Sequence, residues 1–538
     1  MSQPQTPSRR AFLKTSAGAA GGLMLGGLPG ILSARQAPAY VTSDASRPLA
    51  SWGLQIGDML DDRAMIWSRA DRASRFFVEW SLDPSFSTVR RVGGVHALET
   101  SDFTARVDLA GLPPGRDIYL RTTFESLDSE GAASEPVLGS FRTRGVADRG
   151  VRFVWGGDTC GQGWGINPDD GGMRCYEAMR AVNPDFFLHS GDTIYADGVM
   201  SPSVALADGS TWRNAFLDVV PEKTKVAETL QEYHRAYLYN LYDDNVRRFN
   251  SQVPQIWQWD DHEVVNNWSP GKDLSNNTLY TEKRVQTLVG NAAKACLDYS
   301  PMRHHDATES ERIYRKIPHG ETLDVFVLDM RSYRAANSDN RQTEPGADTV
   351  YMGSKQIAWL KAQLLKSTAT WKIIAADMPI GLNVPDGTDS QGRAVFENSS
   401  NGDGPVLGRE FEIAEILSFI KHAGIRNTVW LTADVHYCAA HYYNPQQAQF
   451  SDFDPFWEFV AGPLHAGTFG PNVLDNTFGP QLKFQKVPPA GQSNLPPSAN
   501  YQFFGQIDID RRTRELTVAF KDSTGAVVYT KSLAPEIR

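Results

Sequence analysis

The stretch "DFFLHSGDTIYAD", residues 185–197, decides how the middle of the chain is interpreted. It begins with a short apolar run and ends with Asp192, Tyr195 and Asp197, all within a few residues of a glycine. A short apolar run bounded by turn residues predicts a buried strand. A plain turn would not require two acids and a tyrosine, so the stretch predicts a strand whose carboxyl end carries functional side chains.

Four further apolar strands are predicted to end in the same way. Asp and Asn commonly cap and turn chains, so a single end of this kind would mean little. Several buried carboxylates close together are costly unless cations neutralise them, so the shared pattern predicts a multinuclear metal site. The four strands are "VRFVWGGDTC" (151–160), "PQIWQWDDHEVVNNW" (254–268), "LDVFVLDMRSYR" (323–334) and "TVWLTADVHYC" (428–438).

Two kinds of pattern divide the chain. Short alternating runs with turn residues between them, from 48 to 143, indicate an all-β sandwich, and "LAGLPPGRDIYLRTTF" (109–124) resembles the corner of fibronectin type III domains. After residue 150 strands alternate with helices, which predicts an α/β layered fold with ligands at the carboxyl ends of strands. We expect a mainly helical insertion over 219–299 and an antiparallel meander over 501–533.

The first candidate metal pocket contains sulfur and phenol ligands. Asp158 and Cys160 lie two residues apart on a segment expected to be extended, so both side chains would point the same way and reach one ion. Asp192, Tyr195 and His436 could complete the shell of that ion. A thiolate together with a phenolate suits a Lewis-acidic transition metal, with Fe(III) preferred.

The second candidate pocket offers mainly oxygen. Asp261, Asn266 and Asp434 provide the ligands that Ca²⁺, Mg²⁺ or Mn²⁺ prefer, and Asp192 could bridge the two pockets. Arg331 also follows a predicted strand. Its guanidinium could pair with a nearby carboxylate or contact a bound phosphate, and the sequence leaves both interpretations open.

Length, charge and cysteine content limit the classes of protein that the chain can be. At 538 residues it is too long for one core, so two or more domains are expected. A formal net charge of −10 makes it a poor general binder of nucleic acid. Its four cysteines do not form a disulfide framework, although Cys175 and Cys296 could form a bridge.

The first 37 residues resemble a twin-arginine export signal. Arg9 and Arg10 precede a weakly apolar run, and small residues at 34–39 suit a cleavage site. The apolar run is short and rich in glycine, which disfavours a membrane anchor. We therefore expect a periplasmic or secreted protein, carried in folded form by the twin-arginine translocation machinery and without a stable membrane anchor.

The motifs "GGDTC", "HSGDTIYAD", "WDDHEVVNNW", "LDMRSYR" and "TADVHY" resemble, in this order, those of the alkaline phosphatase D (PhoD-like) family. They are also similar to motifs of purple acid phosphatases and of the wider calcineurin-like metallophosphoesterases. The resemblance implies a four-layer metallophosphatase β-sandwich flanked by helices over 150–538, after a fibronectin type III-like domain over 48–145. It also implies a centre of Fe³⁺ and Ca²⁺.

The resemblance assigns roles to single residues. His262 matches the superfamily histidine that contacts the phosphate or the leaving group. Asp261 stands where the wider superfamily has a metal-binding Asn, and Asn266 is the nearest amide, so either could be the calcium ligand. Cys160 stands where a His is usual, which favours iron over zinc or manganese. The residues that match iron-type ligands are Asp158, Cys160, Asp192, Tyr195 and His436.

The implied function is hydrolysis of phosphomonoesters and phosphodiesters by attack of a metal-bound hydroxide. Arg331 would share the charge of the transition state, and His262 would protonate the leaving group. A phospholipase D-like phosphodiesterase acting on phospholipid head groups is the close alternative. A noncatalytic surface module that binds metal or phosphate is a third hypothesis. We expect a monomer acting on small phosphoesters, with no nucleic acid bound except as a substrate.

Overall fold

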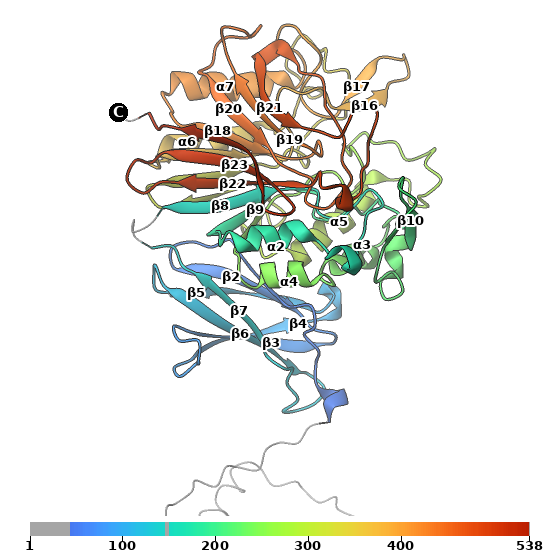
Figure 1. Ribbon diagram of the computed structural model, residues 1–538, viewed down its shortest axis with the longest axis vertical. Coiled ribbons are helices and arrows are strands. Elements are labelled where there is room, and N and C mark those ends of the chain that lie inside the picture. The colour runs from blue at the N-terminus through green and yellow to red at the C-terminus, as the bar shows by residue number, and fades with distance from the viewer. Residues whose placement is uncertain (1–42, 146–149, 537–538) are drawn as a thin grey trace, which may run out of the picture. The chain divides into compact units, whose positions relative to one another are not determined.

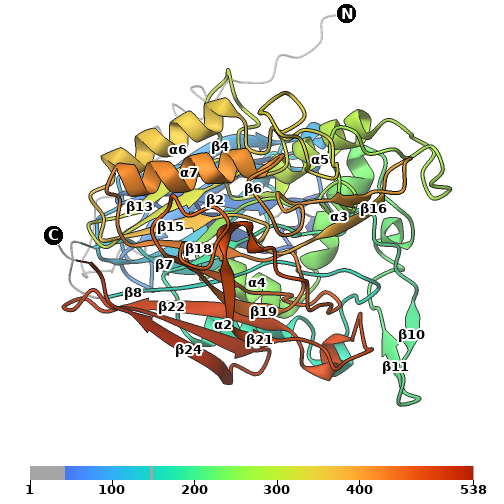
Figure 2. The same cartoon turned by 90° about the horizontal axis from the view of Figure 1, so that it is seen from above.

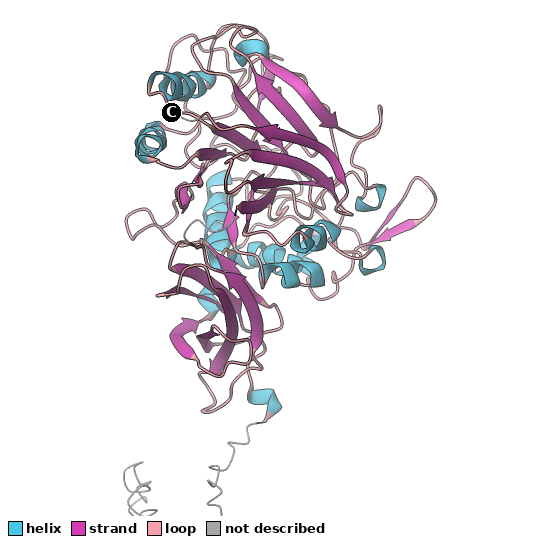
Figure 3. Ribbon diagram, turned by 60° about the vertical axis from the view of Figure 1, so that its left-hand side comes forward, coloured by secondary structure: helices cyan, strands magenta, loops and turns pink. Residues whose placement is uncertain are grey.

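The computed structural model describes residues 43–145 and 150–536, so the export signal expected over 1–37 lies outside the described residues. Two large sheets lie face to face, and helices cover the outer surface of each sheet (Figures 1 and 3). The expected four-layer arrangement of helices, sheet, sheet and helices is therefore confirmed.

The first large sheet has nine strands in the order β24-β23-β22-β8-β9-β12-β1-β2-β5. Strands β8, β9 and β12 are parallel, while β22, β23 and β24 form the antiparallel meander expected at the end of the chain. The strands are β1 (Leu54–Gly57), β2 (Arg63–Arg69), β5 (Thr104–Ala110), β8 (Val151–Gly156), β9 (Phe186–His189), β12 (Gln255–Trp257), β22 (Phe503–Ile509), β23 (Leu516–Asp522) and β24 (Val527–Leu533).

The second large sheet has seven strands in the order β13-β14-β15-β18-β20-β19-β21. Its central strands β14, β15, β18 and β20 are parallel, so their carboxyl ends meet at one edge. The strands are β13 (Arg315–His319), β14 (Leu323–Val327), β15 (Trp371–Ala375), β18 (Thr428–Thr432), β19 (Cys438–Tyr443), β20 (Phe456–Val460) and β21 (Pro480–Lys486).

Alternate residues of the central strands pack into different layers. In β14, Val325 belongs to the core between the sheets, whereas Phe326 packs with α6 and α7 on the outer face. Ile373 and Ile374 repeat this alternation in β15. Burial on both faces explains why these strands are continuous apolar runs. Helices α6 (Ser354–Lys366) and α7 (Glu410–His422) lie next to each other along one side (Figure 2).

Four helices cover the outer face of the nine-stranded sheet. Their apolar residues share a core with sheet residues such as Phe187 and Trp257. The segment 219–299 was expected to be mainly helical; it contains α3, α4 and α5, but less than half of it is helical, and it also contributes β12 to the sheet and a long irregular stretch over 258–284. The helices are α2 (Arg174–Ala181), α3 (Leu230–Asn240), α4 (Asp244–Asn250) and α5 (Val285–Tyr299).

The N-terminal part forms the expected β-sandwich. Strands β1, β2 and β5 pack against a four-stranded sheet in the order β4-β3-β6-β7, with Ile66, Phe76 and Leu120 in the core between them. Strand β1 also pairs in parallel with β12, opposite Gln255, so one layer of the sandwich is part of the nine-stranded sheet. The four strands are β3 (Ser74–Ser81), β4 (Arg90–Ala97), β6 (Asp117–Ser126) and β7 (Val137–Arg142).

Small elements complete the described chain. Two-stranded hairpins are formed by β10 (Ser203–Ala205) with β11 (Thr211–Arg213) and by β16 (Pro385–Thr388) with β17 (Ala394–Phe396). The four cysteines are free thiols, so no bridge joins Cys175 to Cys296. Among residues 43–145 and 150–536, no helix has the length and apolar character that a membrane span requires.

Candidate metal centre

The strand ends of the two sheets bring the predicted acids together. Asp158 follows β8, Asp192 follows β9, and both Asp434 and His436 follow β18. All four residues have positive φ angles of 61°, 52°, 68° and 61° in that order. This left-handed backbone is uncommon for residues other than glycine and concentrates at functional sites, where surrounding structure holds it in place.

Three groups of side chains place their donor atoms within 4.8 Å of one another. Asp192 and Asp261 each belong to two groups, so the groups join into one continuous cluster. The groups are Asp158, Asp192 and His436; Asp192, Asp261 and His262; and Asp260, Asp261 and Asp434.

The electrostatics of this cluster fit bound cations. Both carboxylate oxygens of Asp158 are buried and have no hydrogen-bond partner among the described residues. Burial, together with the charges of Asp261 and Glu263, raises the pKa values of Asp158 and Asp192 well above the ordinary range. Unpaired buried carboxylates are costly, and a metal ion relieves that cost. Gly462 also leaves space here, because a Cβ atom at this position would lie 2.2 Å from Asp158 Oδ2.

Tyr195 and His436 meet at the first group. His436 Nδ1 donates to the carbonyl of Gly467, so Nε2 is left to accept from the Tyr195 hydroxyl at 2.9 Å. Nε2 also lies 3.7 Å from Asp158 Oδ1. A backbone acceptor that fixes the histidine tautomer in this way is typical of metal-binding histidines. Burial lowers the pKa of His436 to about 4, which keeps the ring neutral.

Cys160 does not join the cluster in this structure. Its buried thiol donates to the carbonyl of Trp164 at 3.4 Å, and burial raises its pKa to about 12. The segment from Asp158 to Cys160 was expected to be extended, which is wrong, because the left-handed backbone of Asp158 turns the chain. The two side chains therefore do not share one direction, and the iron-ligand role of Cys160 stays a prediction.

Asp261 and Asn266 differ clearly in position. Asp261 is buried and belongs to two donor groups, and its second oxygen accepts from the backbone of Asn267. Asn266 is exposed, and its amide donates to Asn267 Oδ1 at 2.8 Å. Of the two candidates left open by the sequence, the geometry favours Asp261.

Arg331 lies among carboxylates rather than facing solvent. Its side chain is 0% exposed, with Nε 2.6 Å from Asp260 and 3.1 Å from Asp377, and with Nη1 2.5 Å from Glu397. Nη2 lies 3.5 Å from Asp434. Of the two interpretations of Arg331, the structure contains the carboxylate pairing, and full burial argues against direct contact with a phosphate.

His262 lies beside the cluster with a carboxylate behind it. Its Nδ1 lies 2.7 Å from Asp197 Oδ1, and its ring packs on Tyr195 with 4.3 Å between centroids. Burial by itself lowers the pKa of His262, but the carboxylates of Asp197, Asp261 and Asp192 outweigh burial and raise it well above the ordinary value. These carboxylates therefore favour the protonated form of the imidazole.

Sequence reasoning did not assign several residues that shape the site. Asp197 and Asp260 lie inside the quoted motifs. Asp377 follows β15, an apolar strand that ends near an Asp like the five quoted ones, so the sequence pattern could have indicated all three residues. Glu263 accepts backbone bonds from Asp192, Thr193 and Asp260 and so joins two strand-end loops. Glu397 follows a short hairpin strand, and nothing in its local sequence indicates its role.

Two facing sheets covered by helices, with buried acids and histidines at the strand ends, define a metal-dependent phosphoesterase. The family model described as "PhoD-like phosphatase" matches residues 153–520, and the model described as "PhoD-like phosphatase, N-terminal domain" matches residues 35–145. The chain belongs to the PhoD-like phosphatase family and is a phosphoric ester hydrolase.

Known relatives agree with this assignment. Alkaline phosphatase D from Bacillus subtilis (strain 168) is 25% identical over 461 residues, which cover 81% of this chain and 72% of the relative. The structure titled "Structure of PhoD" aligns with a TM-score of 0.65 and 20% identity, over 91% of this chain and 90% of the other. Purple acid phosphatase PPD1 from yellow lupin (Lupinus luteus) aligns with a TM-score of 0.53 and 11% identity, over 91% and 74%. Both structural likenesses concern the fold.

Proposed function

We propose that the chain is an exported phosphatase that releases phosphate from small monoesters and diesters at a centre of Fe³⁺ and Ca²⁺. The observation that carries the metal dependence is the continuous cluster of acids, in which neither oxygen of Asp158 has a hydrogen-bond partner among the described residues. Bound cations would stabilise such a cluster, and Asp192 belongs to two of its donor groups, so it could contribute to two ion sites.

Two kinds of ligand support two kinds of ion. Fe³⁺ would be held by the acids near Tyr195, with phenolate and imidazole beside them, and Cys160 joins this shell if its thiol turns away from Trp164. Ca²⁺ would be held by Asp192, Asp261 and Asp434, whose carboxylate oxygens are hard ligands. The bound ions supply Lewis acidity to the phosphoryl oxygens and to water.

The protein side chains position the substrate and move protons around this centre. His262 is the proton donor to the leaving group, because Asp197 keeps its imidazole charged and oriented. Arg331 is a positioning residue that holds Asp260 and Asp434 in place through its guanidinium. Glu263 fixes the spacing between the loops of Asp192 and Asp260.

The remaining proposals concern the whole chain. We propose a twin-arginine signal over 1–37, a fibronectin type III-like domain over 48–145 and a catalytic domain over 150–538, with the matches at 35–145 and 153–520 supporting the last two. Export through the twin-arginine machinery suits a protein whose metal ions are inserted before transport. We propose that it acts as a monomer.

The test combines metal analysis with one substitution. Protein purified from the exported fraction should contain iron and calcium, and Asp192→Ala should lose both metal and activity, by ~10²-fold or more, because the bridging carboxylate is gone. Asp208→Ala removes an exposed acid in the turn between β10 and β11, and it should change neither the metal content nor the activity. Full activity of Asp192→Ala would contradict the proposal.

Rates on a monoester, a diester and phosphatidylcholine would separate a phosphatase from a phospholipase.

A further inference from the structure

A cavity of about 630 Å³ lies apart from the metal cluster, between α5 and the loop 308–314. None of the acids in the three metal groups lines it. Trp259 and Ser332 belong to its wall, and they are the chain neighbours of Asp260 and Arg331. The cavity therefore shares loops with the metal centre without sharing its ligands. Its volume is in the range of small-molecule sites.

The charges around the cavity are unevenly paired. Glu309 forms ion pairs with both basic side chains that line the cavity, with Arg312 Nη1 at 3.2 Å and Lys355 Nζ at 3.9 Å. Arg312 is further held by the carbonyl of Tyr314 at 3.0 Å. Glu311 also lines the cavity, and its carboxylate has no hydrogen-bond or ion-pair partner in the part of the chain that the structure describes. Two acids and two basic residues line the cavity, so their formal charges balance, but the Glu311 carboxylate is exposed and is the one of the four charged groups left without a pair in the described residues.

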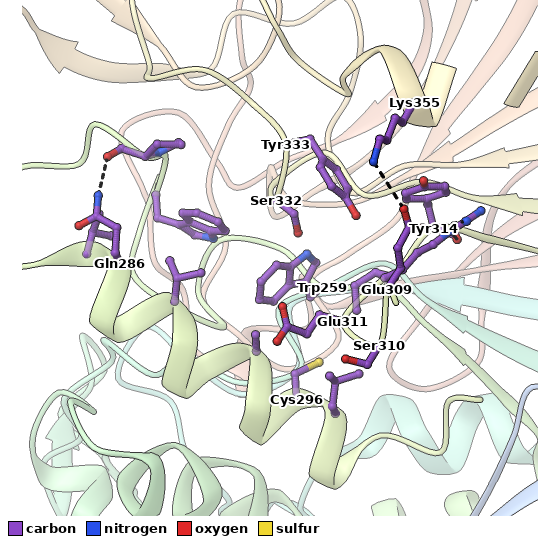
Figure 4. A pocket seen from close by; sticks show the side chains of 18 of the residues that line it. Trp259, Gln286, Cys296, Glu309, Ser310, Glu311, Tyr314, Ser332, Tyr333 and Lys355 are labelled. Atoms are coloured by element: carbon purple, nitrogen blue, oxygen red, sulfur yellow. Dashed lines mark hydrogen bonds and ion pairs between the residues drawn. The ribbon is translucent and has the colours of Figure 1, made fainter. Parts of the chain in front are cut away.

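Aromatic rings line the same cavity as this unpaired carboxylate. Trp259 and Trp268 pack edge to face with 5.8 Å between centroids, and Tyr314 and Tyr333 do so at 5.7 Å. Figure 4 shows Trp259, Glu311 and Tyr333 around the same cavity. Ring faces attract cations through their quadrupole, and tryptophan does so most strongly.

The floor of the cavity is apolar. Val285, Val289 and Ala293 are spaced four residues apart along α5, so they form one stripe of the helix, and all three line the cavity. Such a floor suits an aliphatic or aromatic body rather than a hydrated ion. A single free carboxylate is also too few ligands for a metal ion, which takes several oxygens.

We propose that this cavity binds an organic cation, an ammonium group carried on an apolar or aromatic body. The ammonium lies between the Glu311 carboxylate and the rings of Trp259 and Tyr333, and the apolar body rests on the α5 stripe. The site is separate from the hydrolytic centre, so the inference does not rest on the proposed reaction.

The test is a calorimetric titration of the metal-loaded protein with two probes of equal shape. They are (4-hydroxyphenyl)trimethylammonium and 4-tert-butylphenol. The first has a positively charged nitrogen atom where the second has a neutral carbon atom. We expect the cation to bind ~10-fold or more tightly than its neutral isostere, because both the carboxylate and the rings discriminate for charge. Equal binding of the two probes would overturn the proposal.

Substitutions locate the site. Glu311→Gln should reduce the preference for the cation to ~3-fold or less, since only the ring contribution remains. Glu344→Gln removes the same charge from an exposed position outside the cavity and should leave the preference unchanged. If Glu311→Gln retains the full preference, the cation binds elsewhere and the proposal fails.

Asp192→Ala distinguishes the cavity from the metal centre. The variant lacks a central acid of the metal cluster, yet the cation should bind to it as to the parent protein. Loss of cation binding in Asp192→Ala would place the cation at the metal ligands and overturn the separate site. Because binding and hydrolysis are measured independently, failure of one leaves the other standing.

Discussion

At the scale of single residues, the position of Tyr195 allows the iron assignment to be tested by visible absorption. Its hydroxyl lies 2.9 Å from His436 Nε2, and burial together with Asp192 and Asp158 raises its pKa well above the ordinary value. A phenol in such surroundings ionises only if a strong Lewis acid binds it. The metal-loaded protein should therefore be coloured by charge transfer from phenolate to Fe³⁺.

Tyr195→Phe should remove most of that visible absorbance. The phenylalanine keeps the ring that packs on His262, so the circular dichroism spectrum and the unfolding temperature should stay close to those of the parent protein. The measurement is a visible absorption spectrum at equal iron content. A colourless and fully active parent protein that contains only zinc would refute the iron assignment.

Asp197→Asn tests the proton donor. Asp197 contributes to the raised pKa of His262, so its removal should lower that pKa, and the protonated imidazole should be lost at a lower pH. The alkaline limb of the pH–rate profile should move to lower pH, with a ~10-fold to 10²-fold fall in kcat. Asp208→Asn is the matched control. An unmoved alkaline limb would exclude His262 as the donor.

Single residues also show where prediction from sequence stops. Asp158, Asp192, Asp261 and His436 are brought together as expected, because each follows an apolar strand and strand ends meet. The direction of the Cys160 thiol depends on the φ angle of a neighbouring residue, which no spacing rule reveals. The burial of Arg331 and its pairing with carboxylates depend on Asp260, Asp377 and Glu397, which are distant from it in the sequence.

At the scale of elements, strands were more predictable than the loops between them. The apolar runs of β8, β9 and β18 are buried on both faces, and this leaves a direct pattern in the sequence. Glu397 follows the short strand β17, whose residues show no such pattern, yet its carboxylate reaches Arg331. Side chains supplied by irregular segments can be located only once the fold is known.

The first residue of α7 gives a prediction on stability. Glu410 is buried and lies near Asp475, and both effects raise its pKa to about 9, mainly through burial. In the unfolded chain this group would ionise near its ordinary pKa, so the folded state binds one more proton between the two values. Stability contributed by the protonated group is therefore present below the unfolded pKa and is lost as pH rises toward 9.

Glu410→Gln should weaken this pH dependence. The amide keeps the shape of the protonated acid but cannot ionise, so the variant should gain stability relative to the parent protein as pH rises, by up to ~1.4 kcal/mol per pH unit. Urea unfolding at pH 6 and pH 8 measures the difference. Equal slopes in the two proteins would show that Glu410 is ionised in the folded state.

At the scale of the whole molecule, the N-terminal sandwich is built into the catalytic sheet. Strand β1 is the parallel neighbour of β12, and the backbone N–H of Asp58 donates to the carbonyl of Gln255 at 3.0 Å. Side chains of Gln55, Trp67 and Arg106 donate to carbonyl groups at the end of α5. These donors satisfy groups that a helix end otherwise leaves unpaired. Alternating runs predicted a sandwich, but not that its sheet continues into the next domain.

Asp58 connects this N-terminal layer to the metal-binding loop. Its buried carboxylate accepts from Arg315 Nη2 at 2.7 Å, and Arg315 Nη1 donates to the carbonyl of Trp257 at 2.9 Å. Trp257 is the last residue of β12, just before Asp260 and Asp261. Loss of the Asp58 charge would leave Arg315 without its partner and release the strand end that positions both acids.

Asp58→Asn should therefore lower both stability and activity. Breaking a buried pair costs ~3–5 kcal/mol, so the unfolding temperature should fall clearly, and kcat should fall with it while KM changes little. Asp117→Asn is the control, because Asp117 is exposed and pairs with Arg142 at 3.0 Å at the surface of the N-terminal sandwich. Its loss should cost ~1 kcal/mol or less and leave kcat unchanged. If the two variants behave alike, the N-terminal layer supports the fold in general and does not position the metal-binding loop.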